Sequence, residues 1–465
     1  MNAKRTLVIA TIIAAIGFGL YWALIGRFNP TVPSPDYPPA KDRVQAISQD
    51  LDYLQALLRL DRSFSDEAAR AFEHGRQALL ARAETLTTAQ FVLGVSELVA
   101  LAGNGHTNVA PGARAGLMNR VPLRFAWFAD GLFVVHSDRA NAGLRAARID
   151  TIGGRRPEDM LIDLKRFRGG RQEFARTRSM LLMESPEALA SIYPELDPRQ
   201  LPMALTLADG TRRDVIVGAR AADPNAPNPL PWLYLSPVAA AEIVPDGVNA
   251  LDADTPLPAS LRGHGNSVHH EVLGDGVLYL HLWRMTDDEG GSLSGQLARL
   301  VSASEQPWKA VIVDLRFNGG GDYTKVHGFA RDLRASIAHD GMIVVLVNNE
   351  TFSAALTTVA WLKHYGGERT LIIGERLGDE PAFWAEGGTL TLPNSKLPIA
   401  FASGYHDWKH GCHDLRRCFG LNLWFGVAAG DLDPESETGW RFSDYMRGRD
   451  SVLEAALARI RTPGH

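Results

Sequence analysis

Ser353 stands where the sequence pattern changes from strand to helix. The apolar run at residues 344–347 is typical of a short buried strand, polar residues follow it, and an apolar-periodic segment begins at Ser353. A serine at such a turn can present its hydroxyl at the edge of a sheet, where the N–H groups of a helix N-terminus favour an anion. These are the requirements of an acyl-transfer nucleophile, although an ordinary helix N-cap fits the same pattern.

A glycine-rich loop upstream is a candidate partner for this serine. Residues 310–316 form a second apolar run, which leads into Phe-Asn-Gly-Gly-Gly-Asp at residues 317–322. Three glycines let a backbone approach a ligand closely and direct N–H groups at it. The loop lacks the Lys-Ser/Thr pair of a P-loop and the G-x-G-x-x-G spacing of a dinucleotide site, so neither phosphate motif is present.

Together these segments resemble the S41 peptidases, the family of tail-specific and tricorn-type serine proteases. The family signature is Asp-Leu-Arg-x-Asn-x-Gly-Gly, followed by a strand and then by Ser-Ala at the start of a helix. The matching residues here are Asp314, Leu315, Arg316, Asn318, Gly320, Gly321, Ser353 and Ala354. The resemblance covers most of residues 41–465. It implies an α/β fold with a ClpP/crotonase-like catalytic core, in which Ser353 is the nucleophile.

A serine hydroxyl needs a base to accept its proton before it attacks an amide at neutral pH. The tail-specific branch of the family uses a lysine downstream of the serine, but residues 374–380 offer only Arg376, which stays protonated. The tricorn-type branch uses the histidine of a Gly-His-Thr sequence that follows an N-terminal helical bundle. His106 matches that residue and its context, so the resemblance implies that His106 is the general base.

The resemblance also implies a third catalytic residue, an acid that orients the imidazole. The tricorn-type acid corresponds to residues 405–414, where Asp407 is the first candidate and Asp414 the second. Glu375 is a further alternative. The expected oxyanion-hole donors are the backbone N–H groups of Gly320 (or Gly319) and Ala354.

Hydrophobic periodicity predicts three folded domains after residue 40. Val44, Ile47 and Leu51 follow a helical spacing, and Thr87 with Gln90 forms a capping box before another helix, so we expect an N-terminal helical domain over residues 41–115. Alternating patterns at residues 121–128, 132–135, 147–152 and 201–207 predict strands. The stretch from residue 149 to residue 154 resembles the degenerate PDZ-like domain of S41 proteins, so a PDZ-like mixed domain is expected over residues 116–220. PDZ folds bind extended chain ends at a sheet edge, and a purely structural domain is the alternative.

The second half of the chain is expected to form the catalytic domain. Residues 221–266 are rich in Pro, Ala and Asp and read as a linker. From residue 267 to residue 465 strands and helices alternate, which predicts an α/β layered core. The predicted strands are residues 277–282, 310–314, 342–347 and 370–373, and the predicted helices are residues 292–302, 325–336, 353–364 and 451–460.

The N-terminus has the pattern of a membrane segment. Lys4 and Arg5 precede an uncharged run over residues 7–25, which is close to the length that crosses a bilayer. The positive flank predicts a cytoplasmic N-terminus and an exported body. Because no small-x-small cleavage site follows, we expect residues 1–29 to be an uncleaved transmembrane signal anchor rather than a removed signal peptide. Residues 30–40 read as a Pro-rich stalk, and the catalytic body is expected in the periplasm or outside the cell.

Composition excludes some partners. The chain has 465 residues, 45% of them hydrophobic, and a net charge of −5, so nothing suggests a nucleic-acid partner. Its two cysteines, Cys412 and Cys418, are expected to pair in an oxidising compartment. A zinc site with the nearby histidines is the alternative, but their spacing is irregular. We expect no cofactor and no metal.

These observations predict a membrane-anchored, exported serine peptidase that cleaves peptide or protein substrates through an acyl-enzyme. One alternative is a catalytically impaired S41-like protein that binds peptides or partner proteins. The departures from the family pattern that favour it are at Asn104, Leu356 and Asp379. The other alternative is an acyl-group enzyme with a crotonase-like core, which the export signal and the absence of CoA-binding features disfavour.

Overall fold

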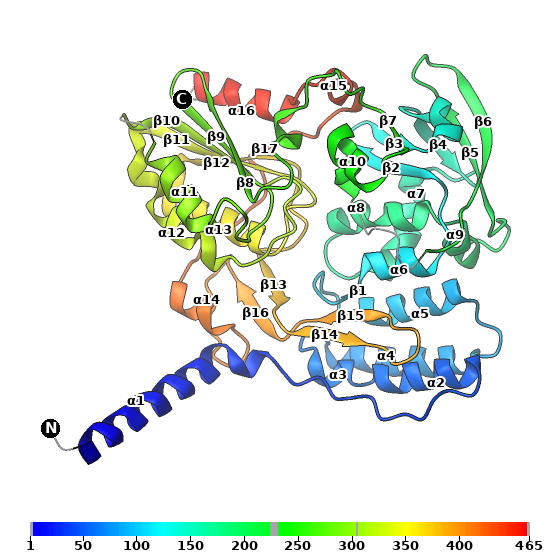
Figure 1. Cartoon of the computed structure of the whole chain (residues 1–465), viewed down its shortest axis with the longest axis horizontal. Helices are drawn as coiled ribbons and strands as arrows, with labels where there is room; N and C mark the ends of the chain where they lie inside the picture. Colours follow the sequence, from blue (N-terminus) through cyan, green and yellow to red (C-terminus); the bar gives the residue numbers. More distant parts are fainter. Residues whose placement is uncertain (1–2, 224–230, 304–305, 463–465) are drawn as a thin grey trace.

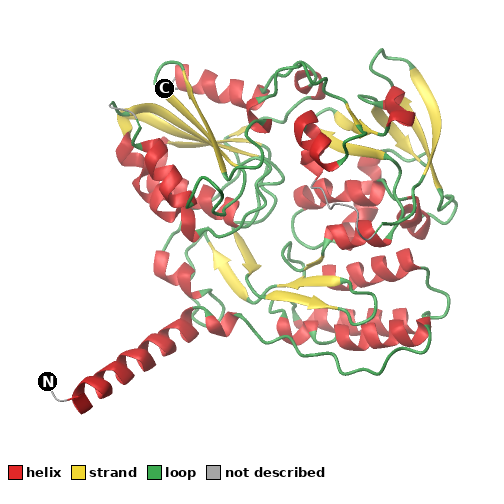
Figure 2. Ribbon diagram, in the orientation of Figure 1, coloured by secondary structure: helices red, strands yellow, loops and turns green. Residues whose placement is uncertain are grey.

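The structure, a computed structural model, describes residues 3–223, 231–303 and 306–462. Figure 1 shows three packed units and a helix, α1 (Ala3–Leu24), that stands away from them at the N-terminus. One unit is a sheet covered by helices, the second is mostly helical, and the third is a mixed unit built on an antiparallel sheet (Figure 2).

The central layer of the first unit, called the core below, is a six-stranded sheet. Its order is β17-β12-β11-β10-β9-β8, and the strands are parallel except for β8, which pairs with β9 in the antiparallel direction. The middle strands are buried on both faces, as their apolar sequences require. The bounds are β8 Val268–Leu273, β9 Val277–Leu282, β10 Trp308–Asp314, β11 Ile337–Val347, β12 Thr370–Gly374 and β17 Ser436–Glu437.

Helices cover both faces of this sheet. One face carries three helices that pack on one another, and α16 (Ser451–Arg461) lies on the other face, against β11 and β12 (Figure 1). The helices of the first face are α11 Leu293–Val301, α12 Thr324–Asp332 and α13 Ala354–Gly366. The layered α/β architecture expected for residues 267–465 is therefore present, with β9 matching its predicted bounds and β11 starting five residues earlier than predicted.

The helical unit follows the apolar periodicity of the sequence. It contains α2 Arg43–Leu54, α3 Leu57–Leu60, α4 Asp66–Leu80 and α5 Thr88–Ala100. The predicted capping box is formed: the Thr87 hydroxyl accepts the Gln90 N–H, and the Gln90 side chain accepts the Thr87 N–H. Because α5 ends at Ala100, the segment with His106 emerges directly from the helical unit.

The mixed unit is an antiparallel sheet in the order β2-β3-β4-β5-β6, with β7 added beside β3. The strands are β2 Leu123–Phe128, β3 Gly131–Ser137, β4 Arg148–Ile152, β5 Gln200–Thr206, β6 Arg212–Gly218 and β7 Val248–Asn249. Its helices are α7 Pro157–Leu164, α8 Gln172–Met183 and α9 Pro186–Ile192. The segment expected as a linker thus contributes a strand to this sheet, and it also forms α10 (Pro237–Ile243); its residues 224–230 lie outside the described residues.

A β-arm (residues 382–407) extends from the core to the helical unit. Its base is the pair β13 (Ala382–Ala385) and β16 (Gly404–Asp407), and its outer part is the pair β14 (Gly388–Thr391) and β15 (Pro398–Phe401). β15 also pairs with β1 (Asn108–Val109), the strand that directly follows the His106 segment. Figure 1 shows the arm running from the core to the helical unit. The arm therefore attaches the helical unit, with its histidine, to the core.

Two further expectations concern the chain ends and the cysteines. Cys412 and Cys418 are bonded to each other, which leaves neither thiolate for zinc. The apolar helix at the N-terminus is long and hydrophobic enough to cross a membrane, with a mean hydropathy of 2.3, and none of it is buried. Residues 30–40 have no regular secondary structure and lie against the helical unit, where Tyr37 donates to Asp52 and Gln49 donates to the Pro38 carbonyl.

A buried arginine holds the end of β10. The Arg316 guanidinium donates to both Asp314 and Asp450, and all three side chains are almost completely buried. Burial alone would raise the pKa of Asp450, but Arg316 outweighs it and lowers that pKa. Asp450 also caps α16, because its carboxylate accepts the Leu453 N–H. The signature Asp-Leu-Arg is thus tied to the C-terminal helix.

Replacing Asp450 with Asn tests this network. Asn still caps α16 but leaves the Arg316 charge with one carboxylate in a buried site, so we expect the free energy of unfolding to fall by about 3–5 kcal/mol. Urea unfolding of the detergent-solubilised chain at pH 7 measures it. Because the pKa of Asp450 is lowered in the folded chain, its ion pair contributes its full stabilisation to the fold above the ordinary aspartate pKa of about 3.9. This stabilisation is lost as the pH falls through the folded pKa. The difference in the free energy of unfolding between Asp450→Asn and wild type should therefore become smaller as the pH falls.

Asp444→Asn is the matched control, because this carboxylate faces an exposed arginine, Arg449, at 3.8 Å. Its loss should change the stability by less than about 1 kcal/mol. Equal stability losses in the two variants would contradict the assigned role of the buried network.

Candidate active site

Ser353 occupies a backbone conformation that few side chains adopt. It is the residue before α13, with φ +56° and ψ −124°, and its side chain makes no capping hydrogen bond to the helix. An N-cap serine ordinarily has an extended backbone and uses its hydroxyl to accept an N–H of the first turn. A non-glycine residue at positive φ costs on the order of 1–3 kcal/mol, which surrounding structure must hold in place. The half-buried hydroxyl therefore remains available for chemistry.

Hydrogen bonds between two loops hold this turn. The Phe352 N–H donates to the Asn318 carbonyl at 3.1 Å, and the Asn318 amide donates to the Leu282 carbonyl at 2.7 Å. The Thr351 hydroxyl donates to the Leu315 carbonyl at 2.9 Å. These bonds hold the turn after β11 against the loop after β10. They explain how the unfavourable φ of Ser353 persists.

The glycine-rich loop packs directly on the serine. A Cβ added to Gly320 would lie 2.7 Å from the Ser353 Cβ and 3.0 Å from the Ala354 nitrogen, and the φ of Gly320 is +109°. Only glycine fits both conditions. The Gly320 N–H already donates to the Asn318 side chain at 2.8 Å, whereas the exposed Gly319 N–H has no partner among the described residues. Of the two glycine N–H groups considered as oxyanion donors, that of Gly319 is therefore the one without a hydrogen-bond partner among the described residues.

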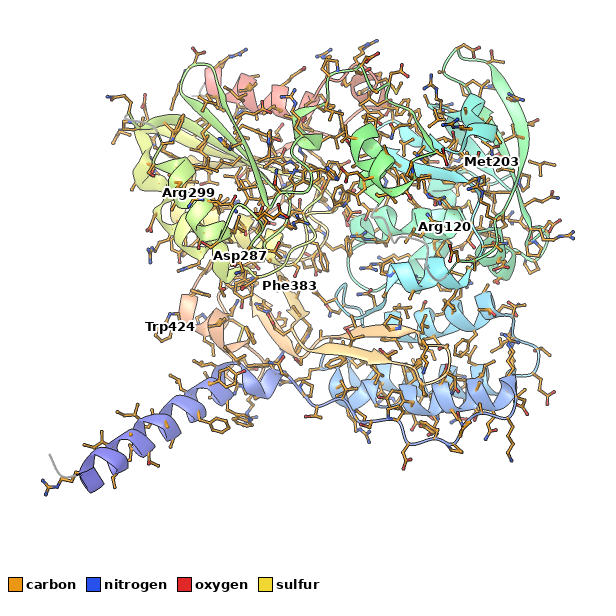
Figure 3. The ribbon with its side chains drawn as sticks, in the orientation of Figure 1. Arg120, Met203, Asp287, Arg299, Phe383 and Trp424 are labelled. Carbon is orange, nitrogen blue, oxygen red and sulfur yellow. A yellow bond between two sulfur atoms is a disulfide. The ribbon has the colours of Figure 1, made fainter. Side chains whose placement is uncertain are left out.

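His106 lies against this turn. Its ring stacks on the Phe352 ring, with centroids 4.3 Å apart, and on the Phe383 ring at 5.2 Å. Gly105 packs so closely that a Cβ there would lie 2.9 Å from the Phe352 ring. Phe352 is the residue before Ser353, so residues about 250 apart in the chain meet at one place, as the sequence predicts. Figure 3 marks Phe383 on β13 of the arm.

The carboxylate beside the imidazole is that of Asp379. Its Oδ2 lies 3.4 Å from His106 Nδ1, and the two side chains are 5% and 16% exposed. Neither ring nitrogen nor Asp379 Oδ2 has a hydrogen-bond partner in the described part of the chain. The pair is thus close but not yet aligned, and His106 does not hydrogen-bond to Ser353 in this state. Catalytic hydrogen bonds are often loose in unliganded structures.

Asp61 positions the histidine loop. Its Oδ2 accepts the Thr107 hydroxyl at 2.6 Å and the Ala402 N–H of the arm at 2.7 Å. Asn104 donates to the same Thr107 hydroxyl at 3.1 Å. One buried carboxylate thus joins the helical unit, the arm and the residue next to His106.

Buried arginines lie on the other side of the stack. Arg168 donates to the Gly105 carbonyl at 3.3 Å, and its guanidinium lies 4.4 Å from the Phe174 ring. That ring stacks on Phe352 at 4.2 Å. Burial lowers the pKa of Arg168 well below its ordinary value, and the neighbouring Arg178 lowers it further. The mixed unit therefore supports the histidine loop through this arginine.

Asp407, the first expected acid, lies elsewhere. Its carboxylate accepts the N–H groups of Lys409 and His410 and lies 3.3 Å from the His410 ring. It stands at the end of β16, where it closes a turn. The structure brings Asp379 to His106 and does not bring Asp407 there.

The two other acid candidates are also engaged away from the imidazole. The exposed Asp414 accepts the Arg416 N–H in the disulfide loop. Glu375 lies 4.0 Å from Arg176 in a small cavity between the core and the mixed unit, and burial raises its pKa. Neither forms an ion pair with His106.

An open groove lies next to the Asp379 side of the site. Its volume is about 680 Å³. Its walls come from the loop before His106, the start of α8 and the base of the arm, and they include Gly103, Arg171, Asp379, Phe383 and Trp384. A groove of this kind can take an extended chain, and its charged side chains have both signs.

Sequence reasoning named the serine, the histidine and the glycine loop as candidates, but it predicted neither the position of Asp379 beside His106 nor the aromatic stack. Asp379 lies within residues 374–380, where the sequence offers Arg376 in place of a lysine and Glu375 as a candidate acid, and where Asp379 is itself a departure from the family pattern. A carboxylate there was visible, but nothing in the sequence shows that the segment turns toward the helical unit.

Comparisons with known proteins identify the fold. No protein-family model matches the chain, and no curated protein matches it in sequence. The crystal structure of mature CPAF matches with a TM-score of 0.56 at 13% sequence identity, over 91% of this chain and 99% of that chain. The structure of mature CPAF complexed with lactacystin matches with a TM-score of 0.52 at 13% sequence identity, over 90% of this chain and 99% of that chain. The tricorn protease gives 0.38 at 15% identity, over 93% of this chain and 38% of that chain.

Replacement of Asp379 and of Asp407 distinguishes the two acids. We expect Asp379→Asn to slow the reaction of Ser353 with a fluorophosphonate by on the order of 10²–10⁴-fold, because the imidazole loses the group that orients it. Asp407→Asn should react within about threefold of wild type, since that carboxylate serves only its own turn. Labelling rates of the two purified variants measure this. A large loss in Asp407→Asn with none in Asp379→Asn would reverse the assignment.

Proposed function

From the S41-type peptidase fold of this chain, we propose that it is a serine peptidase that cleaves peptide bonds through an acyl-enzyme. Ser353 is the nucleophile, His106 the general base and Asp379 the orienting acid. The observation that carries the proposal is the strained Ser353, whose hydroxyl is not used as a helix cap. This serine packs on the glycine loop, and its neighbour Phe352 stacks on a histidine from another unit.

The first half-reaction forms an ester. His106 Nε2 accepts the Ser353 hydroxyl proton while Oγ bonds to the carbonyl carbon of the substrate. The negative charge that develops on the carbonyl oxygen is stabilised by the N–H groups of Gly319 and Ala354. Removing one such donor costs about 2.7–4 kcal/mol in the barrier of known enzymes. The imidazolium then protonates the leaving amine, and the C–N bond breaks.

The second half-reaction regenerates the enzyme. Water attacks the acyl carbon, His106 accepts its proton, and the same N–H groups stabilise the second oxyanion. The proton returns to Oγ as the acid product leaves. For both halves the ring must align Nε2 with the hydroxyl and Nδ1 with Asp379, whose Oδ2 lies 3.4 Å away.

The substrate is a peptide or protein segment in extended form. The groove beside Asp379 offers room for such a chain, and the exposed edge of the mixed unit, which resembles a PDZ-like domain, is the expected place for further binding by strand addition. The groove is lined by three cations and three carboxylates (Lys165, Arg171, Arg376, Glu173, Asp379 and Glu380), so no strong preference for one charge is expected.

The location follows from the N-terminal helix. Its exposed apolar surface and the positive residues before it fit a retained signal anchor with the body exported. The disulfide near the site agrees with an oxidising compartment.

A catalytically impaired, peptide-binding protein is the second candidate. It is favoured by the absence of a hydrogen bond from His106 to the serine and by Leu356, which fills an apolar core position on α13 where family members carry a glutamate.

A fluorophosphonate probe separates the two functions. We expect covalent labelling of wild type at Ser353, no labelling of Ser353→Ala, and at least about 10²-fold slower labelling of His106→Ala, because the hydroxyl then has no base. Mass spectrometry of the labelled peptide identifies the site, and hydrolysis of a fluorogenic peptide library provides the activity.

Ser302→Ala and His410→Ala are the matched controls, since both side chains lie on the surface and outside the site. They should label like wild type. Failure of the wild-type chain to label or to cleave any peptide would favour the binding protein.

A further inference from the structure

The end of the N-terminal helix is fastened to the core. Phe28 is completely buried and lies in the core cluster, where its ring packs on Phe419 with centroids 5.2 Å apart. The Ser403 hydroxyl donates to the Phe28 carbonyl. The chain therefore enters the folded body at Phe28, only four residues after α1 ends at Leu24.

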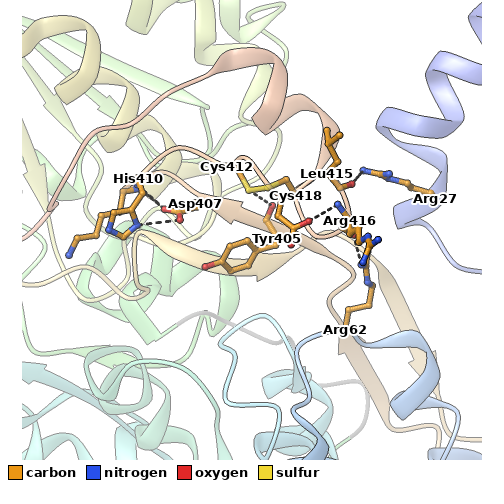
Figure 4. Close-up of a disulfide and its surroundings, with 11 residues drawn as sticks. Arg27, Arg62, Tyr405, Asp407, His410, Cys412, Leu415, Arg416 and Cys418 are labelled. Carbon is orange, nitrogen blue, oxygen red and sulfur yellow. Dashed lines mark hydrogen bonds and ion pairs between the residues drawn. A yellow bond between two sulfur atoms is a disulfide. The ribbon is translucent and has the colours of Figure 1, made fainter.

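Two neighbouring segments flank this junction. Arg27 donates to the Leu415 carbonyl at 2.6 Å, as Figure 4 shows. Gly420, the first residue of α14 (Gly420–Phe425), lies so close to Leu24 that a Cβ there would be 2.4 Å from the helix backbone. The last turn of α1 therefore has a fixed place beside the loop at residues 412–418 and beside α14.

These two segments expose apolar side chains next to the helix end. The disulfide closes the loop, and Leu415 at its tip is 68% exposed. Trp424 on α14 is 75% exposed and points outward beside the end of α1 in Figure 3. Arg416 is exposed next to Leu415. We call Arg27, Leu415, Arg416 and Trp424 the junction patch.

The composition of the junction patch suits a lipid headgroup region. Tryptophan is favoured at the membrane–water interface, and arginine near the end of a span pairs with phosphate. Exposed apolar side chains that stand singly need no explanation, but Leu415 and Trp424 both belong to segments that contact the end of a helix of bilayer length.

We propose that the junction patch rests on the surface of the bilayer that α1 enters and so fixes the tilt of the catalytic body above it. The bilayer is the occupant because the patch borders the end of α1, whose apolar side chains between Val8 and Trp22 are exposed and need a lipid environment. This inference rests on the proposed anchor.

Tryptophan quenching tests the contact. The full-length chain is reconstituted in vesicles of phosphatidylcholine and phosphatidylglycerol, with and without lipids brominated near the headgroup. Of the ten tryptophans, Trp22 in α1 and Trp424 are then the ones that the bromines reach. We expect the quenched part of the emission to fall by about half in Trp424→Phe and to stay unchanged in Trp127→Phe, which lies in the mixed unit.

Vesicle flotation separates failure of the anchor from failure of the patch. If the chain floats and Trp424→Phe shows the same quenching as wild type, the body does not rest on the bilayer and the inference is overturned, while the anchor stands. If the full-length chain does not float with the vesicles, the proposed membrane anchor is wrong, and the proposed contact of the junction patch with the bilayer is then wrong as well. Peptidase activity enters neither outcome, so the proposed reaction is judged separately.

Discussion

The pairing of Arg316 with two carboxylates is the constraint on which the site depends. A buried guanidinium is unfavourable unless its charge is balanced, and here Asp314 from the same strand end and Asp450 from the start of α16 balance it. This fixes the backbone at the end of β10, from which the glycine loop begins. The loop in turn gives the Asn318 carbonyl to the Phe352 N–H. The loop that holds Ser353 at its unusual φ thus begins at a backbone position that this buried charge balance fixes.

The second constraint is that the base comes from outside the core. The helical unit alone would leave His106 on an open loop, and the core alone would have a nucleophile without a base. The β-arm joins them, since β15 pairs with β1 and Asp61 accepts hydrogen bonds from both Thr107 and Ala402. Asp379 lies just before the arm, so the segment that fastens the helical unit also carries the proposed acid. The contacts that hold the helical unit to the arm are therefore also the contacts that bring the proposed base near the proposed acid.

The sequence allowed the layered core, the serine turn and the histidine to be predicted because each has a local signature. Residues 277–282 are apolar except for His281, and a run of that kind between turn residues is typical of a buried strand. Asp379 had no such signature: its role depends on how the chain turns after β12 and on the packing of Phe383 against a ring from another unit. The strand β6 was also missed, because its exposed residues Arg212, Arg213 and Asp214 hide the alternation. Local sequence patterns predict helices and strands, but they do not predict which residues of different units come into contact.

The aromatic stack explains how a misaligned histidine can still serve as a base. Both faces of the imidazole are covered, by Phe352 and by Phe383, so only the ring edges can reach polar partners. One edge already faces Asp379 at 3.4 Å. A small in-plane rotation keeps both stacking contacts, each worth roughly 0.5–1.5 kcal/mol, while a flip out of the stack forfeits them. The stack therefore leaves the ring free to move in the one plane that aligns its nitrogens and opposes every other motion. Because Phe352 belongs to the serine turn and Phe383 to the arm, the position of the ring depends on how the arm packs against the core.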